Sequence, residues 1–453
     1  MTLNYRYFSQ YEGKAPGMAL SNLECRAPAA VDSFHSLFLA MFPTAALTSL
    51  LVLALTVAAK PVVIRDSLIS LPFAKTINVT SIPLLLKHDQ ARAKALRARA
   101  EAKISGVSLS SDAVVSISVE NQAVTYAASV GVGSPATTYS LLIDTGSSNT
   151  WVGAGKAYVK TSTSTQTSNR VSVTYGSGSF SGTEFTDTVS LGSGLTITKQ
   201  SIGVASTSQG FSGVDGILGI GPVDLTLDTL SPATTSTIPT VTDNLFSQGT
   251  ITSNLVAVSF EPTTSLTAQN GELTFGGTDS SKFTGSITFT GLTSTSPASE
   301  FWGINQSVRY STSTTILSTT AGIVDTGTTL ILLASDALKR YQSATGAVAD
   351  ANTGLLRLTT AQFNNLKSLF FTIGGTTFEL TANAQIWPRA INSAIGGTSN
   401  NVYLIVGDLG TPSGEGLDFI NGFTFLERFY SVFDTANNRL GLATTSFTQA
   451  TTN

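Results

Sequence analysis

The sequence predicts an all-β protein of two lobes, and three observations lead to this prediction. From Val114 onward, short stretches of alternating apolar and polar residues are separated by Gly, Pro, Ser and Thr, a pattern typical of strands and turns. The chain of 453 residues is longer than one ordinary hydrophobic core requires. The motif Asp-Thr-Gly occurs twice, at Asp144 and at Asp325. This repeat indicates two halves of similar structure.

The two motifs share their flanking residues as well. An apolar run precedes each aspartate, Leu141–Ile143 in the first copy and Gly322–Val324 in the second. Two hydroxyl residues follow each glycine, Ser147-Ser148 and Thr328-Thr329. Glycine permits a close approach of the backbone, and a hydroxyl group can donate a hydrogen bond to a nearby carboxylate. Each copy therefore brings a carboxylate to the end of a strand and into a tight turn.

A pair of carboxylates in one site can perform acid–base chemistry. Like charges about 3 Å apart raise the pKa of one group and leave the other low. One carboxylate then acts as a base on water, while the protonated partner donates to a carbonyl oxygen. We therefore expect Asp144 and Asp325 to hydrolyse a carbonyl compound without a covalent intermediate.

The composition excludes the competing hydrolytic mechanisms. The chain has two histidines, His35 and His88, and one cysteine, Cys25, all of them upstream of position 105. The rest of the chain cannot form a Ser-His-Asp triad, a Cys-His pair, or a zinc site with histidine or thiolate ligands. Only 12% of the residues are charged, against roughly 25% in an average soluble protein. This composition suits a secreted, acid-tolerant β protein.

The segments Ile143–Trp151 and Ile323–Thr329 resemble the two active-site motifs of pepsin-like aspartic proteases, in particular those of the fungal polyporopepsin group. The resemblance extends from about residue 115 to the C-terminus. It implies a bilobal all-β fold with pseudo-twofold lobes and a central cleft. It also implies an acid endopeptidase with a catalytic aspartate dyad and neither a metal nor an organic cofactor.

The resemblance assigns further roles by position. Ser147 and Thr328 would hydrogen-bond the outer oxygens of the dyad, and Tyr175 and Ser177 would close over the peptide. The other residues implied in substrate contact or in support of the site are Leu142, Gly146, Phe211, Ile217, Gly327, Thr145, Trp151 and Thr326. A preference for large apolar residues beside the scissile bond follows from the carbon surface of this set.

One hairpin is predicted by pattern as well as by resemblance. Val171–Tyr175 alternates apolar and polar residues, turns at Gly176–Ser179 and resumes at Phe180. Its position after the first motif resembles the flap of the family. By that match Tyr175 covers the substrate and Trp151 is its hydrogen-bond partner.

The region before the β body contains an apolar segment. Residues Ser36–Ala59 carry no charge and end in small residues, which predicts a signal peptide at 41–59 with translation beginning at Met41. Residues 1–40 would then be an upstream extension. The alternative is a signal anchor, because the uncharged stretch is long enough to span a bilayer. Pro43 interrupts it and favours secretion.

Residues 60–112 are predicted to form a basic propeptide. Nine basic and three acidic residues lie between Lys60 and Lys103, whereas 13 basic and 22 acidic residues follow position 104. Opposite charges would hold such a segment on the enzyme as an intramolecular inhibitor. A basic residue, Lys87 or Lys94, is expected to pair with the dyad, although the sequence does not decide which one.

The remaining expectations concern the organisation and partners of the protein. The N-terminal lobe is placed at 113–288 and the C-terminal lobe at 289–453. Polypeptides are the expected substrates, with no nucleic acid partner, and the enzyme is expected to be a secreted monomer with a glycan at Asn305, in Asn-Gln-Ser. Phe423 stands where pepsins have an acidic residue, and the body lacks the family's usual cysteines. The alternative function is an inactive pepsin-fold binding or inhibitory protein.

Overall fold

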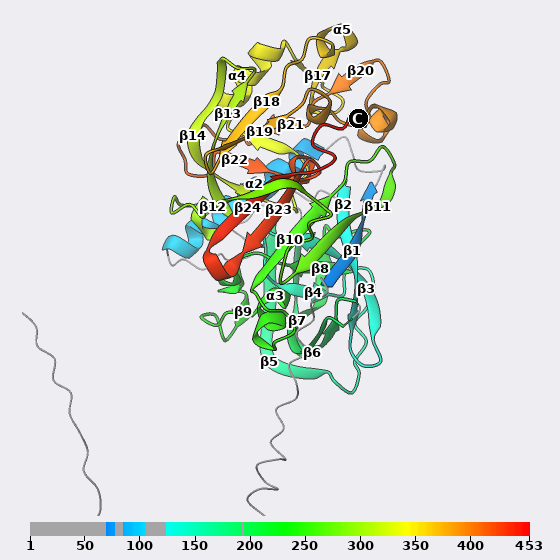
Figure 1. Ribbon diagram of the computed structural model, residues 1–453. Coiled ribbons are helices and arrows are strands. Elements are labelled where there is room, and N and C mark those ends of the chain that lie inside the picture. The colour runs from blue at the N-terminus through cyan, green and yellow to red at the C-terminus, as the bar shows by residue number, and fades with distance from the viewer. Residues whose placement is uncertain (1–68, 78–84, 106–123, 177, 193) are drawn as a thin grey trace, which may run out of the picture. The chain divides into compact units, whose positions relative to one another are not determined.

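The computed structural model describes residues 69–77, 85–105 and 124–453, except 177 and 193. All of these residues belong to one compact unit, Val63–Asn453 (Figure 1). The predicted extension at 1–40 and signal peptide at 41–59 lie outside the described residues. Within the described ranges, no helix is both long enough and apolar enough to cross a membrane.

The fold is mostly β, as the sequence predicts. Its largest sheet has 14 strands and joins elements from the beginning, middle and end of the described chain. In sheet order the strands are β12 (Thr284–Gly291), β24 (Arg439–Thr444), β23 (Phe429–Asp434), β10 (Leu255–Phe260), β11 (Thr267–Phe275), β1 (Ile69–Ile77), β2 (Val124–Val132), β3 (Thr137–Asp144), β8 (Gly216–Gly219), β4 (Thr150–Val152), β7 (Thr196–Gln209), β6 (Gly178–Ser190), β5 (Thr165–Tyr175) and β9 (Leu230–Ser231).

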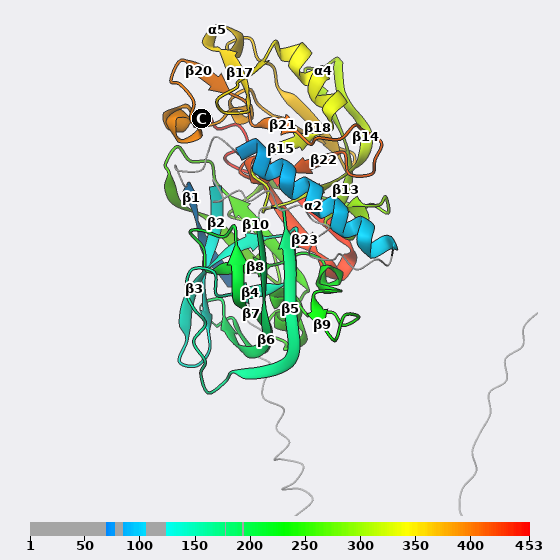
Figure 2. The same ribbon diagram turned by 180° about the vertical axis from the view of Figure 1, so that it is seen from behind.

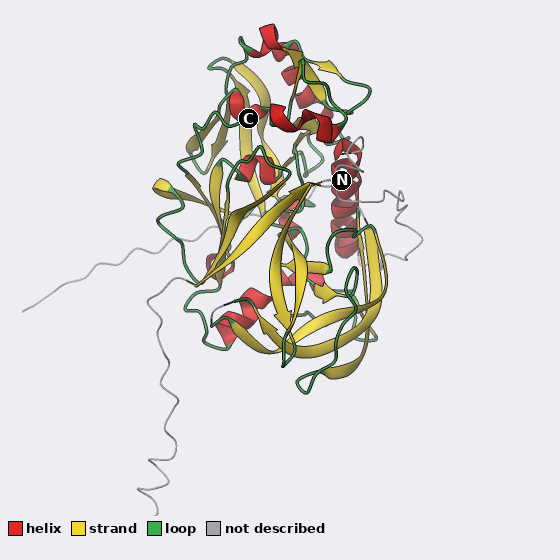
Figure 3. Cartoon of the chain, turned by 90° about the vertical axis from the view of Figure 1, so that its right-hand side faces the viewer, coloured by secondary structure: helices red, strands yellow, loops and turns green. Residues whose placement is uncertain are grey.

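Two smaller sheets complete the β structure. The first has seven strands, in the order β19 (Thr376–Leu380), β18 (Leu369–Ile373), β13 (Gly303–Tyr310), β14 (Thr314–Val324), β22 (Phe419–Asn421), β15 (Ile331–Leu333) and β21 (Val406–Asp408). The second has three strands, β16 (Val348–Ala349), β17 (Leu356–Thr359) and β20 (Asn401–Tyr403). In a side view, long strands of the molecule are strongly twisted (Figure 3).

Five α-helices are found in the described residues, and four of them are short. They are α2 (Leu85–Ser105), α3 (Val241–Ser247), α4 (Ser335–Thr345), α5 (Thr360–Phe363) and α6 (Phe423–Leu426). The long helix α2 crosses the molecule between its two halves (Figure 2). Its buried side chains recur at helical spacing, at Leu85, His88, Asp89, Arg92, Ala93, Leu96 and Ala100. One face of α2 is therefore covered by the body of the protein.

Each Asp-Thr-Gly motif is positioned by the same arrangement of three strands. In the first half, β3 ends at Asp144 and pairs in parallel with β8, placing Asp144 opposite Gly219. In the second half, β14 pairs in parallel with β22, placing Val324 opposite Asn421. The strand that follows each motif, β4 or β15, then pairs antiparallel with the same partner. The repeated sequence thus produces a repeated local structure.

The predicted hairpin is present as β5 and β6. Tyr175 pairs with Gly178 at its tip, and Val173 pairs with Phe180. The alternation in this stretch is explained by burial, because Val171, Val173 and Tyr175 are buried whereas Ser172 is exposed. Ser177, at the turn, lies outside the described residues.

Strand β1 is bound to the body by a buried ion pair. β1 lies between β11 and β2, with Phe73 opposite Ala128 of β2. The Lys75 ammonium lies 2.6 Å from Oε1 of Glu427, and their side chains are only 2% and 6% exposed. The Tyr126 hydroxyl donates to the same carboxylate oxygen at 2.7 Å. Breaking such a pair on one side leaves an uncompensated buried charge.

We expect Lys75→Met to destabilise the full chain by about 3–5 kcal/mol, because the Glu427 carboxylate would remain buried without its cation. The double variant Lys75→Met, Glu427→Gln should recover most of this loss, since neither charge is then present. Denaturant unfolding at pH 7 measures both variants. Equal stability of the single and double variants would contradict the assignment.

Candidate active site

The two motif aspartates meet at the centre of the structure. Asp144 and Asp325 are both fully buried, each at the C-terminal end of the strand that leads into its motif. The Thr145 amide donates to Oγ1 of Thr326 at 3.0 Å, and the Thr326 amide donates to Oγ1 of Thr145 at the same distance. These reciprocal hydrogen bonds fix the two turns against each other. They also fix the separation of the two carboxylates.

The glycines of the motifs leave room for the opposite carboxylate. A Cβ atom added at Gly146 would lie 2.7 Å from Oδ1 of Asp325, and one added at Gly327 would lie 2.7 Å from Oδ1 of Asp144. Both distances are too short for a carbon atom. The backbone amides of the glycines donate to the inner oxygens of their own motif's aspartate, at 2.9 Å for Asp144 and 3.1 Å for Asp325. Any side chain at either glycine would disturb the pair.

The hydroxyl residues complete the environment of each carboxylate. Ser147 donates to Oδ2 of Asp144 at 2.5 Å, and Thr328 donates to Oδ2 of Asp325 at 2.5 Å. These are the contacts with the outer oxygens that the resemblance implies. The next hydroxyl, Ser148, instead donates to the carbonyl of Pro222 at 2.6 Å. Of the two hydroxyl groups that follow Gly146, the first therefore contacts the dyad and the second does not.

One guanidinium group connects the two aspartates. Nη2 of Arg92, on α2, lies 2.5 Å from Oδ1 of Asp144 and 2.9 Å from Oδ1 of Asp325. Nε of Arg92 donates to Oδ2 of Asp325 at 2.7 Å. A nitrogen atom of the chain thus lies between the inner oxygens, where a shared water molecule would have to bind.

The electrostatics of the site follow from burial and from Arg92. Burial raises the pKa of Asp144, an effect that Arg92 opposes and that repulsion by Asp325 reinforces. Burial would also raise the pKa of Asp325, but attraction to Arg92 and the hydrogen bonds from Arg92 and Thr328 bring it below its ordinary value. The pKa values of the two carboxylates therefore move in opposite directions while Arg92 lies between them.

The basic residue that contacts the dyad was not identified correctly from the sequence. Lys87 and Lys94 are exposed on α2, and Arg92 makes the contact instead. Helical spacing explains the difference, because Arg92 shares the buried face with Leu85, Ala93 and Leu96. This apolar stripe was the signal in the sequence that could have selected Arg92.

Two further residues of α2 were missed. The Asp89 carboxylate accepts hydrogen bonds from the amides of Thr329 and Leu330, at 3.2 and 2.7 Å. His88 is buried, and neither of its ring nitrogens has a hydrogen-bond partner in the described part of the chain. Both residues stand next to the stripe that also positions Arg92. The same helical spacing was therefore the signal for these two residues as well.

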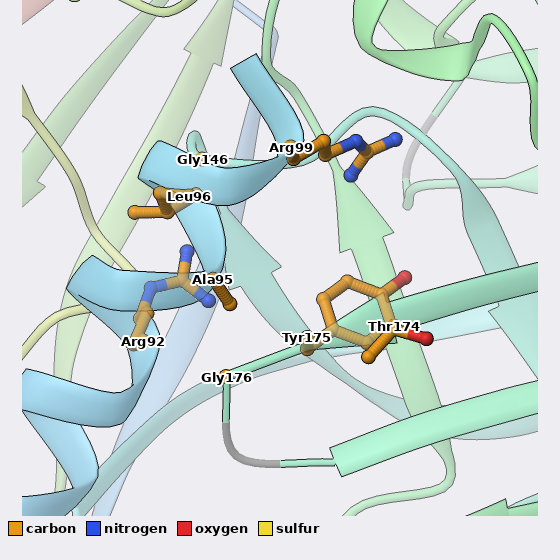
Figure 4. Close-up of a pocket in the computed structure, with 8 residues that line it drawn as sticks. All are labelled: Arg92, Ala95, Leu96, Arg99, Gly146, Thr174, Tyr175 and Gly176. Atoms are coloured by element: carbon orange, nitrogen blue, oxygen red, sulfur yellow. The ribbon is translucent and has the colours of Figure 1, made fainter. Parts of the chain in front are cut away.

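The residues expected around the substrate form one apolar cluster. Leu142, Tyr175, Phe211 and Ile217 belong to it, together with Trp151. Nε1 of Trp151 donates to the Tyr175 hydroxyl at 3.1 Å. The ring of Phe211 packs edge-on against both aromatic rings. Tyr175 and Arg92 line the same small pocket beside α2 (Figure 4).

Asn305, the expected glycan site, lies in strand β13. Its side chain is nevertheless exposed, and Oδ1 accepts a hydrogen bond from Thr293 at 3.1 Å. The described residues contain no group of three or more His, Cys, Asp or Glu side chains placed to hold a metal ion.

Comparison with known proteins decides the family. The family model described as "Eukaryotic aspartyl protease" matches residues 125–445. The chain belongs to this family. Polyporopepsin from Irpex lacteus is 76% identical over 338 residues, which are 75% of this chain and 99% of that protein. Pepsin A from Sus scrofa is 30% identical over 338 residues, covering 70% of this chain and 80% of pepsin A.

The solved structures agree with the sequence comparison. The crystal structure of aspartic proteinase from Irpex lacteus superposes with a TM-score of 0.73 and 67% identity, covering 85% of this chain and 100% of that one. The protein is an aspartic endopeptidase of the polyporopepsin type, with the pepsin-like fold that the sequence predicts. Strand β1 and helix α2 of this aspartic protease both precede the residues matched by the family model.

We expect Thr328→Val in the active aspartic protease to move the acidic limb of the kcat/KM pH profile upward by about one pH unit. The lost hydroxyl donates to Asp325, and removal of a donor to a carboxylate raises its pKa. Ser148→Ala is the control, because that hydroxyl contacts Pro222 and not the dyad. Superimposable profiles for Thr328→Val and the parent enzyme would contradict this role.

Proposed function

We propose that the full chain is the secreted precursor of an acid endopeptidase, in which Asp144 and Asp325 are catalytic and residues 60–112 inhibit them. The observation that carries this proposal is the Arg92 bridge between the two carboxylates. An enzyme with a guanidinium group between its catalytic oxygens has no room there for water. The activity therefore requires α2 to leave.

The mechanism requires one ionised and one protonated carboxylate, a state that mutual repulsion of two neighbouring carboxylates favours. With α2 removed, the ionised carboxylate takes a proton from a water molecule held between the inner oxygens. The oxygen of this water attacks the carbonyl carbon while the protonated carboxylate gives its proton to the carbonyl oxygen, which yields a tetrahedral gem-diol. Collapse of the diol breaks the C–N bond, as the leaving nitrogen receives a proton from the carboxylate that took one from water and the other carboxylate takes a proton back from a diol hydroxyl. Aspartic proteases are the established example of two carboxylates that share one proton in this way. Ser147 and Thr328 hold the outer oxygens during these transfers.

We expect Asp144→Asn and Asp325→Asn each to reduce turnover by at least ~10²–10⁴, because either change removes one of the two acid–base groups. Asp279→Asn is a matched control, since its carboxylate caps a surface turn at Ser281. Acid hydrolysis of a denatured protein measures all three variants. Retention of most activity by a folded dyad variant would exclude the mechanism.

Two groups favour release of α2 in acid. The lowered pKa of Asp325 means that its contribution to docking is present at neutral pH and is lost as the pH falls through that value. Burial lowers the pKa of His88 from 6.5, so the released imidazole binds a proton more readily than the docked one. Docking therefore weakens as the pH falls below 6.5. Arg92 keeps its charge throughout.

Two other groups act in the opposite direction. Burial raises the pKa of Asp89 to about 7, and it also raises the pKa of Asp144. Because the docked state then favours their protonated forms, both groups strengthen docking as the pH falls. These four groups therefore have opposing effects on the pH of activation.

We expect His88→Gln to shift activation of the full chain to lower pH, because one proton-binding group that favours release is removed. Arg92→Gln should shift activation to higher pH, because the ionic bridge to the dyad is lost. Lys87→Gln, at an exposed neighbouring position, is the control. Chain shortening and peptide cleavage are followed across a pH series. Identical activation profiles for all three variants would refute the model.

The specificity proposal rests on the apolar cluster around Tyr175. Burying a Phe, Leu or Met side chain against Leu142, Phe211 and Ile217 would contribute ~1.5–3 kcal/mol. Some fungal relatives also cleave after lysine by means of a carboxylate one position past the flap glycine. Ser177 stands at that position here. A hydroxyl group cannot offset the desolvation of an ammonium group as a carboxylate can.

We expect strong preference for Phe or Leu over Lys directly before the scissile bond, measured as kcat/KM on matched peptides. Ser177→Asp should improve cleavage after Lys, because it supplies the missing negative charge. Efficient cleavage after Lys by the parent enzyme would show that this pocket is assigned wrongly.

The proposal includes the processing predicted from the sequence. Translation from Met41, a signal peptide at 41–59, lobes at 113–288 and 289–453, and a monomeric mature enzyme remain proposals. A glycan at Asn305 is supported by the exposure of that side chain. The uncharged stretch Ser36–Ala59 supports secretion.

A further inference from the structure

Besides Arg92, three more basic side chains of α2 form hydrogen bonds or ion pairs with residues outside the helix. Nη2 of Arg97 donates to the Thr411 hydroxyl at 2.9 Å and to the Leu417 carbonyl at 2.8 Å. Nη1 of Arg97 lies 3.2 Å from Oε2 of Glu415 and donates to the Glu415 carbonyl at the same distance.

The other two basic side chains lie further along the helix. Arg99 donates to the Leu225 carbonyl. The Lys103 ammonium lies 2.6 Å from Oε2 of Glu300 and 3.9 Å from Oδ2 of Asp224. All acceptors for the three basic residues therefore belong to the body and not to α2. We call this set the basic-residue site: Asp224, Leu225, Glu300, Thr411, Glu415 and Leu417.

The basic-residue site is assembled from distant parts of the chain. Asp224 and Leu225 lie in the short 3₁₀ helix Val223–Thr226, and Glu300 ends another, Ala298–Glu300. The remaining acceptors come from the segment 411–417, between β21 and β22. Removal of α2 would leave these acceptors in place and without their basic partners.

The acceptors are of two kinds, which matters for an enzyme working in acid. Carboxylates attract a cation while they are ionised. The carbonyl oxygens of Leu225 and Leu417 and the Thr411 hydroxyl accept hydrogen bonds at any pH. A basic side chain thus finds acceptors in this region even where the carboxylates are protonated.

We propose that the basic-residue site selects polypeptide substrates that carry a lysine or arginine several residues from the scissile bond. The inference rests on the proposed function, because it assumes that the scissile bond of a substrate lies where Arg92 lies in the full chain. It concerns substrate positions further along the chain than the residue directly before the scissile bond, where lysine is disfavoured. On this proposal, the basic side chains of α2 occupy the positions that a basic side chain of a bound substrate would take.

Helix geometry gives the distance from the scissile bond. At about 1.5 Å per residue, Arg97, Arg99 and Lys103 follow Arg92 by about 7, 10 and 16 Å along the axis. An extended substrate advances about 3.3 Å per residue. The favoured basic residue should therefore stand about two to five positions from the bond, on one side only.

The test uses the acid-activated enzyme and a neutral parent peptide with phenylalanine before the scissile bond. Lysine, norleucine or glutamate is placed in turn at each of the five positions on either side, and kcat/KM is measured. Lysine should exceed norleucine by about two- to fivefold within the window on one side, as expected for a partly exposed ion pair. Glutamate should fall below norleucine at the same positions.

Variants assign the effect to residues. Glu300→Gln and Glu415→Gln should each reduce the lysine-to-norleucine ratio, and Glu300→Lys should reverse it in favour of glutamate. Glu379→Gln is the matched control, because this carboxylate lies on β19 and accepts from Ser368. Ratios are taken within one enzyme, so a general loss of activity does not affect them.

Two results would overturn the inference. If lysine and norleucine peptides are cleaved equally at every position while the parent peptide is hydrolysed, the basic-residue site serves only to hold α2. If no peptide is cleaved after removal of α2, the proposed function itself is wrong and the inference falls with it. A one-sided lysine preference that Glu300→Lys reverses would support it.

Discussion

The structure depends on holding two buried carboxylates close together. Asp144 and Asp325 are fully buried, and their like charges oppose this arrangement. Reciprocal hydrogen bonds between Thr145 and Thr326 fix the turns, and the two glycines leave space for the opposite carboxylate. The repeated three-strand arrangement brings each motif to this point. In the full chain, Arg92 supplies the positive charge that makes the paired arrangement stable.

The acid environment expected for the enzyme also favours the protonated form of a second buried carboxyl group, that of Glu184. Burial raises the pKa of Glu184 to about 7, and the hydrogen bond from Ser201 partly opposes this shift. Because its folded-state pKa is raised above the ordinary 4.5, Glu184 stabilises the fold below that pH, and the contribution is lost as the pH rises through about 7. The buried carboxylate of Glu427 is stabilised differently, by an ion pair with Lys75 of β1.

The parts of the structure predicted correctly from the sequence are those with local patterns. The apolar run before each Asp-Thr-Gly predicted a strand that ends at a carboxylate, and the alternation at Val171–Tyr175 predicted the hairpin. Arg92 was missed because charge alone does not show which face of a basic helix is buried. The apolar residues at helical spacing show that face, and Arg92 lies on it. The Lys75–Glu427 pair joins residues 352 positions apart, and no local pattern can reveal such a pairing.

The central claim is that α2 occupies the catalytic position through Arg92. The most direct measurement is the binding of a statine peptide, whose hydroxyl group mimics the tetrahedral intermediate between the two carboxylates. Calorimetry at one pH would compare the intact chain with the chain from which α2 has been removed. We predict no measurable binding to the intact chain and one bound peptide per molecule after removal. Equal affinity for both forms would contradict the account, because Arg92 would then not block the dyad.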